Sequence, residues 1–480
     1  MPVEVDSNEG QQTIAVHMPA DEAGPSAAAV DAGRDDPAQP ESSLKAEASQ
    51  LGTLAFPIMT VSMLQFLMVM VDMGMVGRLG TQELAASALA NTFFNCLQHP
   101  VVGCATALDT LLATAWGAGQ HAAFGQWAKA GVLTLLLLGV PVAGALLVAE
   151  PLLVGIGQDK RLAALAGAFA WRLVPGVFPH FAFIAMTKYL QAQSILAPAV
   201  WIALLANGIN LFLNWLLIYA LGLGFTGAPV ATSLSRWAQF LCLLGYLAWS
   251  RPRHAKTIPS WHDPEGVPLA TRMGKFVHLG APGALMLGLE AWSFEATTLL
   301  AGLLGTVPLA AHMVLINTVG FTFLSFPFAL GIASSIRVGW LLGAGDAPRA
   351  QTCAKVSFML MLAFMAVLSG AKVVARRQIG RIFSDDPLVI DLVSSLVLIA
   401  ALFQISDGCQ AAVAGVFRGM GRQRTVAGLN FVGFWCVCVL ARHRRIHVHT
   451  RTRARAHTQI STRTRTYTQI ERAYKPDDDV

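Results

Sequence analysis

The sequence predicts an all-α polytopic membrane protein, built from two parallel-repeat helical lobes (6 + 5 or 6 transmembrane helices) around a central cavity. Three observations carry this prediction: the composition, a series of long apolar segments, and an internal repeat. Of the 480 residues, 54% are hydrophobic and only 13% are charged, whereas soluble proteins carry about 25% charged residues. The composition therefore excludes an ordinary soluble domain.

Each apolar segment is close to the length of about 20 residues that a helix needs to cross the hydrocarbon core. The 43 glycines fit close packing between such helices, because small residues let the backbones approach. The predicted spans are 54–76, 84–106, 127–149, 163–186, 198–221, 228–249, 277–303, 309–334, 353–374, 388–416 and 425–441.

The two halves of the chain repeat one another. GRLGTQELAA at 77–86 matches GLLGTVPLAA at 302–311, and GAG at 117–119 matches GAG at 343–345. The first unit contains six spans, an even number, so the second unit starts on the same side of the membrane. The two lobes are therefore predicted to be parallel repeats, related by an axis along the membrane normal.

The order of the segments predicts five regions. They are a disordered cytoplasmic tail (1–49), an N-terminal six-helix lobe (50–250), a cytoplasmic inter-lobe loop (251–276), a C-terminal lobe of about five helices (277–441) and a basic low-complexity tail (442–480). The second lobe lacks a counterpart of the sixth span. We interpret the Thr/Arg/His-rich tail as an aberrant end, and a polybasic lipid-binding segment is the alternative.

Orientation follows from the Lys and Arg residues of the short loops, which are more frequent on the cytoplasmic side. Their bias places the N-terminus in the cytoplasm, although ARRQIGR at 375–381 goes against it. The expected location is the plasma membrane or the vacuolar membrane.

Two carboxylates, Glu290 and Glu295, lie near the middle of the predicted span 277–303. A charge at that depth costs roughly 2.5–3.5 kcal/mol on insertion scales. Five helical residues separate them by about 7.5 Å along the axis and roughly 140° around it, so both can face only a wide cavity. Asp407 and Asp72 also lie within spans. A carboxylate removed from water is readily protonated, so these four residues are the predicted proton-coupling and substrate-binding groups, with structural hydrogen bonds or ion pairs as the alternative.

Other intramembrane residues receive different interpretations. Trp292 and Phe178 are candidate cavity-lining aromatics, because an aromatic face beside a carboxylate suits an organic cation; simple packing is the alternative. Arg236 and Asp109 are interpreted as structural. The sequence has no GxxxxGK[ST] or HExxH motif and no credible Ser-His-Asp arrangement, so we expect no enzyme, no cofactor, no metal site and no nucleic-acid partner.

Six stretches carry a family resemblance. They are VDMGMVGRLGTQELAA (71–86), ALDTLLATAWGAGQ (107–120), KYLQAQSILAP (188–198), LEAWSFEATTLLAGLLG (289–305), SSIRVGWLLGAGDAPRAQ (334–351) and DGCQAAVAGVFRGMGRQR (407–424). Through them the chain resembles the multidrug and toxic compound extrusion (MATE) family, eukaryotic type, over residues 45 to 440. Its last helix is missing from the pattern.

The resemblance implies residue roles. Glu290 and Glu295 match the paired Glu of the family's seventh helix, and Asp407 matches an acidic position of the tenth. Asp72 matches an Asp that prokaryotic relatives use in the N-terminal lobe. Two further cavity candidates, Asn210 and Asn214, lie where those relatives carry Asn and Asp, which favours coupling in the C-terminal lobe. Gln191, also a cavity candidate, resembles a motif residue that positions helices.

The resemblance also implies a function, namely a secondary active transporter that exports organic solutes or xenobiotics by proton-coupled antiport and alternating access. The expected partners are a small organic solute, a proton rather than sodium, and the lipid bilayer, with the protein a monomer. Two alternatives stay open: a lipid-linked substrate flippase on a related fold, and a truncated non-functional product.

Overall fold

The computed structural model describes residues 40–252, 254–258, 266–384 and 386–437, and within these ranges the chain forms helices and no strand. The chain divides into two units, Met1–Ser43 and Leu44–Val480, and the helices after residue 43 belong to the second. Of the described residues, seven segments are long and apolar enough to span a membrane: Leu44–Gly77, His121–Leu147, Lys160–Gln191, Ala197–Ala220, Thr306–Gly343, Ala347–Val374 and Pro387–Gly419. The predicted all-α membrane fold is confirmed. The predicted tail 442–480 and residues 1–39 lie outside the described ranges.

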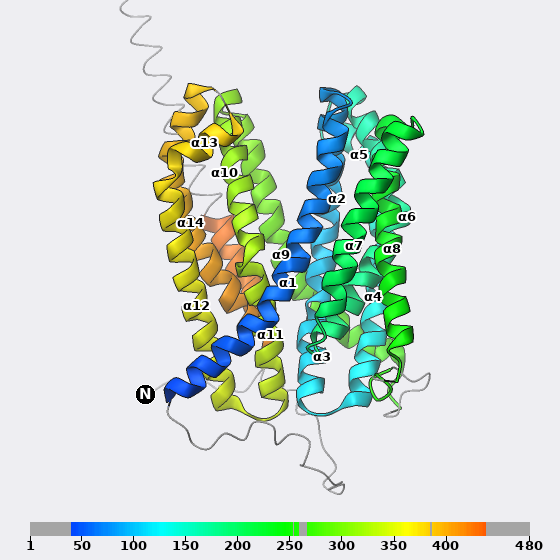
Figure 1. Ribbon diagram of the computed structural model, residues 1–480, viewed down its shortest axis with the longest axis vertical. Helices are drawn as coiled ribbons and strands as arrows, with labels where there is room; N and C mark the ends of the chain where they lie inside the picture. Colours follow the sequence, from blue (N-terminus) through cyan, green and yellow to red (C-terminus); the bar gives the residue numbers. More distant parts are fainter. Residues whose placement is uncertain (1–39, 253, 259–265, 385, 438–480) are drawn as a thin grey trace, which may run out of the picture. The chain divides into compact units, whose positions relative to one another are not determined.

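The first half of the described chain forms α1 to α8 (Figure 1). Their bounds are α1 (Pro40–Gly77), α2 (Thr81–Ala105), α3 (Ala107–Gly117), α4 (His121–Leu147), α5 (Ala149–Gly155), α6 (Lys160–Gln191), α7 (Ala197–Asn214), continued by a π-helical turn (Trp215–Ala220), and α8 (Gly227–Trp249), preceded by a 3₁₀ turn (Gly224–Thr226).

The second half repeats this order. Its helices are α9 (Leu269–Gly302), α10 (Thr306–Ser325), α11 (Pro327–Gly343), α12 (Ala347–Val374), α13 (Arg376–Phe383), α14 (Pro387–Gly419), α15 (Gln423–Asn430) and a π-helical turn (Phe431–Val437). α2 begins at Thr81 and α10 at Thr306, 225 residues later; α4 begins at His121 and α12 at Ala347, 226 residues later. The repeat seen in the sequence is therefore also a repeat of elements.

Three features of the helices differ from the sequence prediction. The predicted span 309–334 crosses a break, because α10 ends at Ser325 and α11 starts at Pro327. Proline has no backbone N–H and suits a first helical turn. The short helices α5 and α13 were not anticipated, and α1 and α9 begin well before the predicted starts at 54 and 277. α2, α8 and α9 coincide with predicted spans but are not among the seven segments that are long and apolar enough to span a membrane.

α1 links the two halves. Near its N-terminal end, Leu51, Leu54 and Ile58 pack in one apolar cluster with residues of α11, among them Ile332. Farther along, Asn207 of α7 donates a hydrogen bond to the Leu64 carbonyl (3.0 Å). In Figure 1 the helix runs obliquely from the region of α11 and α12 towards α2 and α7.

Glycines permit a reciprocal contact between α3 and α11. A Cβ on Gly117 would collide with the Trp340 carbonyl, and a Cβ on Gly343 would collide with the Thr114 carbonyl. Gly117 and Gly343 are 226 residues apart, as are Thr114 and Trp340. Such exchange of equivalent contacts is what a two-fold axis between repeats produces. The two lobes therefore make equivalent contacts with each other here, as two related repeats can.

A second close contact joins α2 to α9. A Cβ on Gly103 would meet the Gly283 carbonyl, and one on Gly280 would lie 2.5 Å from the Cys104 sulfur. Small residues at these positions let the two helices approach closely. α2 of the first half and α9 of the second are therefore packed backbone against backbone.

Candidate functional site

Two acidic side chains come together in the second half of the chain. Glu290 projects from α9 and is partly buried, while Asp407 projects from α14 and is 5% exposed. Their carboxylates lie close enough for their charges to interact. The Oδ1 atom of Asp407 is buried without a hydrogen-bond partner among the described residues. Two predicted coupling residues, far apart in sequence, thus share one environment.

Two amides and an arginine complete this group. Gln410 donates a hydrogen bond from Nε2 to Oδ1 of Asn430 (2.9 Å), and Asn430 directs its Nδ2 towards Oε2 of Glu290 (3.5 Å). The Arg418 guanidinium is near enough to interact electrostatically with Glu290. Of the ion pairs between described residues, none includes Glu290 or Asp407.

Sequence reasoning did not single out Gln410 or Asn430. Gln410 follows Asp407 by three residues, so the two share a face of α14, and this spacing was a usable signal. Asn430 offered no comparable signal, because it lies in the short helix α15 and meets α9, 140 residues away in sequence, only in the folded chain.

Glu295 occupies a different environment from Glu290. It is partly buried, and its charge interacts with Cys96 of α2. Trp292 also faces α2, where its Nε1 donates a hydrogen bond to the Cys96 carbonyl (3.1 Å). The 140° separation expected around the helix therefore places the two glutamates beside different neighbours.

A third group surrounds Asp72 in the first half. Its Oδ1 accepts hydrogen bonds from Nδ2 of Asn210 (3.0 Å) and of Asn214 (2.6 Å), and its Oδ2 accepts one from Oγ1 of Thr232 (2.7 Å). Asn210 and Asn214 are fully buried. Both cavity candidates thus bind Asp72, and Thr232 is a partner that the sequence analysis missed.

Asp109 and Gln191 lie outside these three groups. Lys188 of α6 donates from Nζ to both carboxylate oxygens of Asp109 (2.6 and 2.8 Å), and the pair is buried. This ion pair agrees with the structural interpretation of Asp109. Gln191 is buried at the last residue of α6, three residues beyond Lys188.

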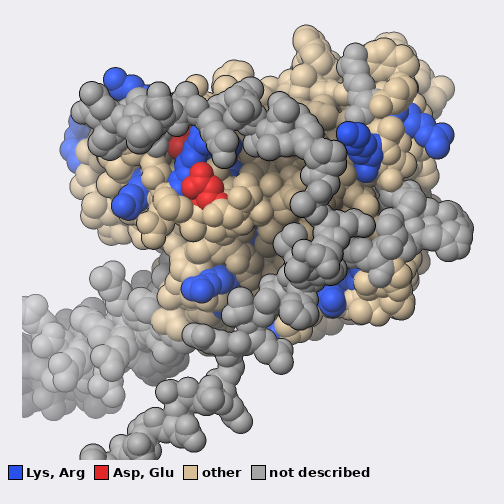
Figure 2. Space-filling view, turned by 90° about the horizontal axis from the view of Figure 1, so that it is seen from below, with Lys and Arg blue, Asp and Glu red and all other residues tan. Residues whose placement is uncertain are grey.

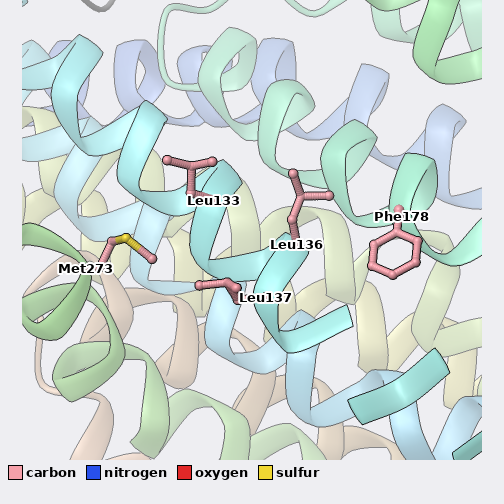
Figure 3. Close-up of a pocket in the computed structure, with 5 residues that line it drawn as sticks. All are labelled: Leu133, Leu136, Leu137, Phe178 and Met273. Carbon is pink, nitrogen blue, oxygen red and sulfur yellow. The ribbon is translucent and has the colours of Figure 1, made fainter. Parts of the chain in front are cut away.

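Phe178 lines an apolar pocket rather than an acidic site. The pocket has a volume of about 570 Å³, and Leu133, Leu136 and Leu137 of α4 and Met273 of α9 form the rest of its lining (Figure 3). All five lining residues are apolar, so the pocket suits apolar groups. In the described part of the chain, no group of three or more His, Cys, Asp or Glu residues is placed to hold a metal ion.

Comparison with known proteins gives a consistent result. A family model described as MatE matches residues 57–216 and 282–441, one stretch in each half. The chain is 32% identical to Protein DETOXIFICATION 16 of Arabidopsis thaliana over 402 residues, covering 83% of this chain and 82% of that protein. It is 33% identical to Multidrug and toxin extrusion protein 1 of Xenopus tropicalis over 393 residues, covering 82% of this chain and 67% of that protein.

Solved structures agree in fold. The eukaryotic MATE transporter AtDTX14 matches with a TM-score of 0.77 and 30% identity, covering 82% of this chain and 87% of that chain. The Vibrio cholerae MATE transporter VcmN in its bent form matches with a TM-score of 0.73 at 17% identity, over 82% and 89% of the two chains. The protein is therefore an integral membrane protein of two helical lobes, and it belongs to the multidrug and toxic compound extrusion (MATE) family, whose members are transporters and not enzymes.

Proposed function

We propose that this chain is a proton-coupled antiporter that exports small organic solutes by alternating access, with Glu290 and Asp407 as the groups that exchange protons for solute. The observation that carries the proposal is the proximity of these two carboxylates, on α9 and α14, without an ion-pair partner among the described residues. The protein acts as a monomer in the plasma membrane or the vacuolar membrane, with a cytoplasmic N-terminus.

The physical argument concerns the charge of the pair. Two carboxylates close together in a poorly solvated place repel one another, and the repulsion is relieved when one of them takes up a proton. A cationic solute relieves it equally well. Proton and solute then compete for one negative charge, which is the thermodynamic requirement for exchange of one for the other.

The helix contacts indicate where movement is needed. Close contacts between α3 and α11 and between α2 and α9 join the two lobes. To expose Glu290 and Asp407 alternately to the two sides, the lobes must change these contacts, as in the rocking of one repeat against another.

The negative charge of the Glu290–Asp407 pair argues against the flippase alternative. A flippase for a phosphate-bearing lipid needs cations in its path, whereas the pair in the C-terminal lobe is anionic. The truncated-product alternative depends on the segment after residue 437, which lies outside the described residues.

The proposal can be tested in proteoliposomes with a fluorescent organic cation as the probe. Glu290→Gln and Asp407→Asn should each abolish efflux driven by a pH gradient, because a neutral amide cannot exchange a proton. A sodium gradient in place of the pH gradient should drive no efflux in the unaltered protein.

Matched controls are available for both substitutions. Asp391→Asn alters an exposed carboxylate on the same helix α14, and Glu150→Gln alters an exposed carboxylate in α5; both should leave efflux unchanged. Normal pH-driven efflux by Glu290→Gln at equal protein levels would remove Glu290 from the mechanism.

A further inference from the structure

The carboxylate of Asp72 is surrounded by neutral hydrogen-bond donors. Both its oxygens accept hydrogen bonds, from the two asparagine amides of α7 and from the Thr232 hydroxyl of α8. Asp407 in the other lobe is different, because its Oδ1 has no hydrogen-bond partner among the described residues. The buried aspartates of the two lobes therefore differ in their hydrogen-bond partners.

Arg236 lies close to Asp72. It follows Thr232 by four residues on α8, so it lies one turn farther along the same helix face. It is 8% exposed, its guanidinium lies over the Phe94 ring at 4.6 Å from the centroid, and its charge interacts with that of Asp72. The other titratable group that interacts with Arg236 is His180 of α6.

The guanidinium is buried without a full set of partners. Its Nε and Nη1 atoms have no hydrogen-bond acceptor among the described residues. A buried cation without a full set of hydrogen bonds needs a compensating charge nearby, and Asp72 is the carboxylate whose charge it meets. With Asp72 ionised, the two side chains form a pair of zero net charge, and they make no direct ion pair among the contacts of the described residues.

A transported cation would disturb this balance. The Oδ1 atoms of Asn210 and Asn214 are buried and have no partner among the described residues, so together with Asp72 they would be the natural ligands of sodium. Adding sodium, or a proton on Asp72, beside Arg236 would leave one uncompensated positive charge in a poorly solvated place. The charge of Arg236 therefore disfavours the binding of sodium or a proton, which the oxygen atoms of Asp72, Asn210 and Asn214 alone would favour.

We propose that Arg236 is a fixed counter-cation of Asp72, and that it keeps transported sodium and protons out of the N-terminal lobe. This inference rests on the proposed function only in treating the protein as an ion-coupled transporter.

The experiment uses the purified full-length chain in detergent. Sodium binding is measured with radioactive sodium, and the unfolding midpoint is measured in sodium chloride against choline chloride and over a range of pH. The unaltered protein should bind no sodium and show no sodium-specific shift. Arg236→Gln removes the fixed charge, so its midpoint should rise with sodium, and should rise with acid by more than that of the unaltered protein, because a ligand that binds only the folded state stabilises it.

Two further variants assign the response to the pair. In Arg236→Gln/Asp72→Asn the response should disappear, and the loss of stability should be smaller than the sum of the two single losses, as expected for interacting charges. Arg172→Gln is the matched control: Arg172 lies on α6 in the same lobe, its Nη1 donates to the Ala168 carbonyl (2.6 Å), and its guanidinium lies over Trp171. It should acquire no cation response.

Each outcome decides the proposal. The proposal is overturned if the unaltered protein binds sodium and Asp72→Asn abolishes that binding. It is also overturned if Arg236→Gln shows no cation response. If Arg236→Gln fails to fold, recovery of folding in the double variant supports the pair, and failure of both contradicts it. The result is independent of Glu290→Gln, whose normal transport would defeat the proposed function and leave this inference standing.

Discussion

Glu47 of α1 is a buried carboxylate with two arginine partners. It is fully buried, and it accepts hydrogen bonds from Nε and Nη2 of Arg337 (2.9 and 2.8 Å) and from Nε of Arg349 (2.9 Å). The arginines belong to α11 and α12, so the contact ties the start of α1 to the second half of the chain. Bidentate pairs of this kind are among the stronger hydrogen bonds in proteins.

We predict that Glu47→Gln lowers the stability of the protein. The change leaves two guanidinium groups facing a neutral amide, and breaking a buried pair typically costs about 3–5 kcal/mol. The effect should fall towards the low end, because Arg349 is partly exposed and keeps some of its water. Thermal unfolding in detergent would show a lower midpoint, whereas Glu150→Gln at an exposed site should unfold like the unaltered protein.

Three buried acids thus have three different surroundings. Glu47 is held by two arginines, Asp72 by three neutral donors with Arg236 nearby, and Asp407 has the charge of Glu290 as its neighbour. Of these three acids, Asp407 alone has a second carboxylate as its charged neighbour, and protonation of either carboxylate would relieve their repulsion. The chemistry of these residues is therefore set by their neighbours and not by their type.

At the scale of elements, glycine decides how closely the lobes meet. Gly343 of α11 faces the Thr114 carbonyl of α3, and Trp340 of α11 donates from its indole Nε1 to the Ala192 carbonyl beyond α6 (2.9 Å). A single methyl group at the glycine has no space without displacing backbone. The α3–α11 contact is therefore sensitive to the smallest possible substitution.

Gly343→Ala should destabilise this arrangement of the lobes by about 1–3 kcal/mol, the usual cost of overpacking. Unfolding midpoint and efflux rate both measure the effect, because the contact also has to change during transport. Gly144→Ala is the control, since its added methyl meets no atom within 4 Å. There the better helix propensity of Ala should leave stability equal or raise it by up to about 1 kcal/mol. Equal midpoints for the two variants would contradict the role given to Gly343.

At the scale of the whole molecule, the helices define two ends of the bundle. Figure 2 shows the end at which α3, α11 and the start of α1 lie in Figure 1, and Lys and Arg side chains occupy several separate places on it. Basic residues concentrate on the cytoplasmic side of membrane proteins. The proposed cytoplasmic N-terminus therefore predicts that this end of the bundle faces the cytoplasm.

The proposed orientation can be checked by labelling single cysteines with an impermeant maleimide. Ala344→Cys, in the exposed turn between α11 and α12, should react only in inverted vesicles. Leu221→Cys, in the exposed turn between α7 and α8, should react in intact cells. Cys96, Cys104, Cys242, Cys353 and Cys409 are buried or partly buried, and the unaltered protein with its seven cysteines gives the background labelling. The reverse pattern would invert the orientation.

Much of this architecture was predictable from the sequence. The apolar segments, the repeat and the even number of spans in the first half predicted the helices and the relation of the lobes. Glu290, Asp407 and Asp72 were identified because a carboxylate in an apolar helix is conspicuous. Hydropathy and helical periodicity suffice here because they depend on residues within a few turns of one another.

The partners of those carboxylates were decided by the tertiary structure. Asp72 meets Asn210 across 138 residues and Glu47 meets Arg337 across 290. Arg236 and Asp109 were both interpreted as structural. The charge of Arg236 interacts with that of Asp72, and Asp109 forms an ion pair with Lys188. Which side chains meet depends on the depth and rotation of each helix against its neighbours, and close packing at a few glycines sets these. The sequence by itself therefore determined which helices form and which carry acids, while helix packing determined which side chains surround each acid.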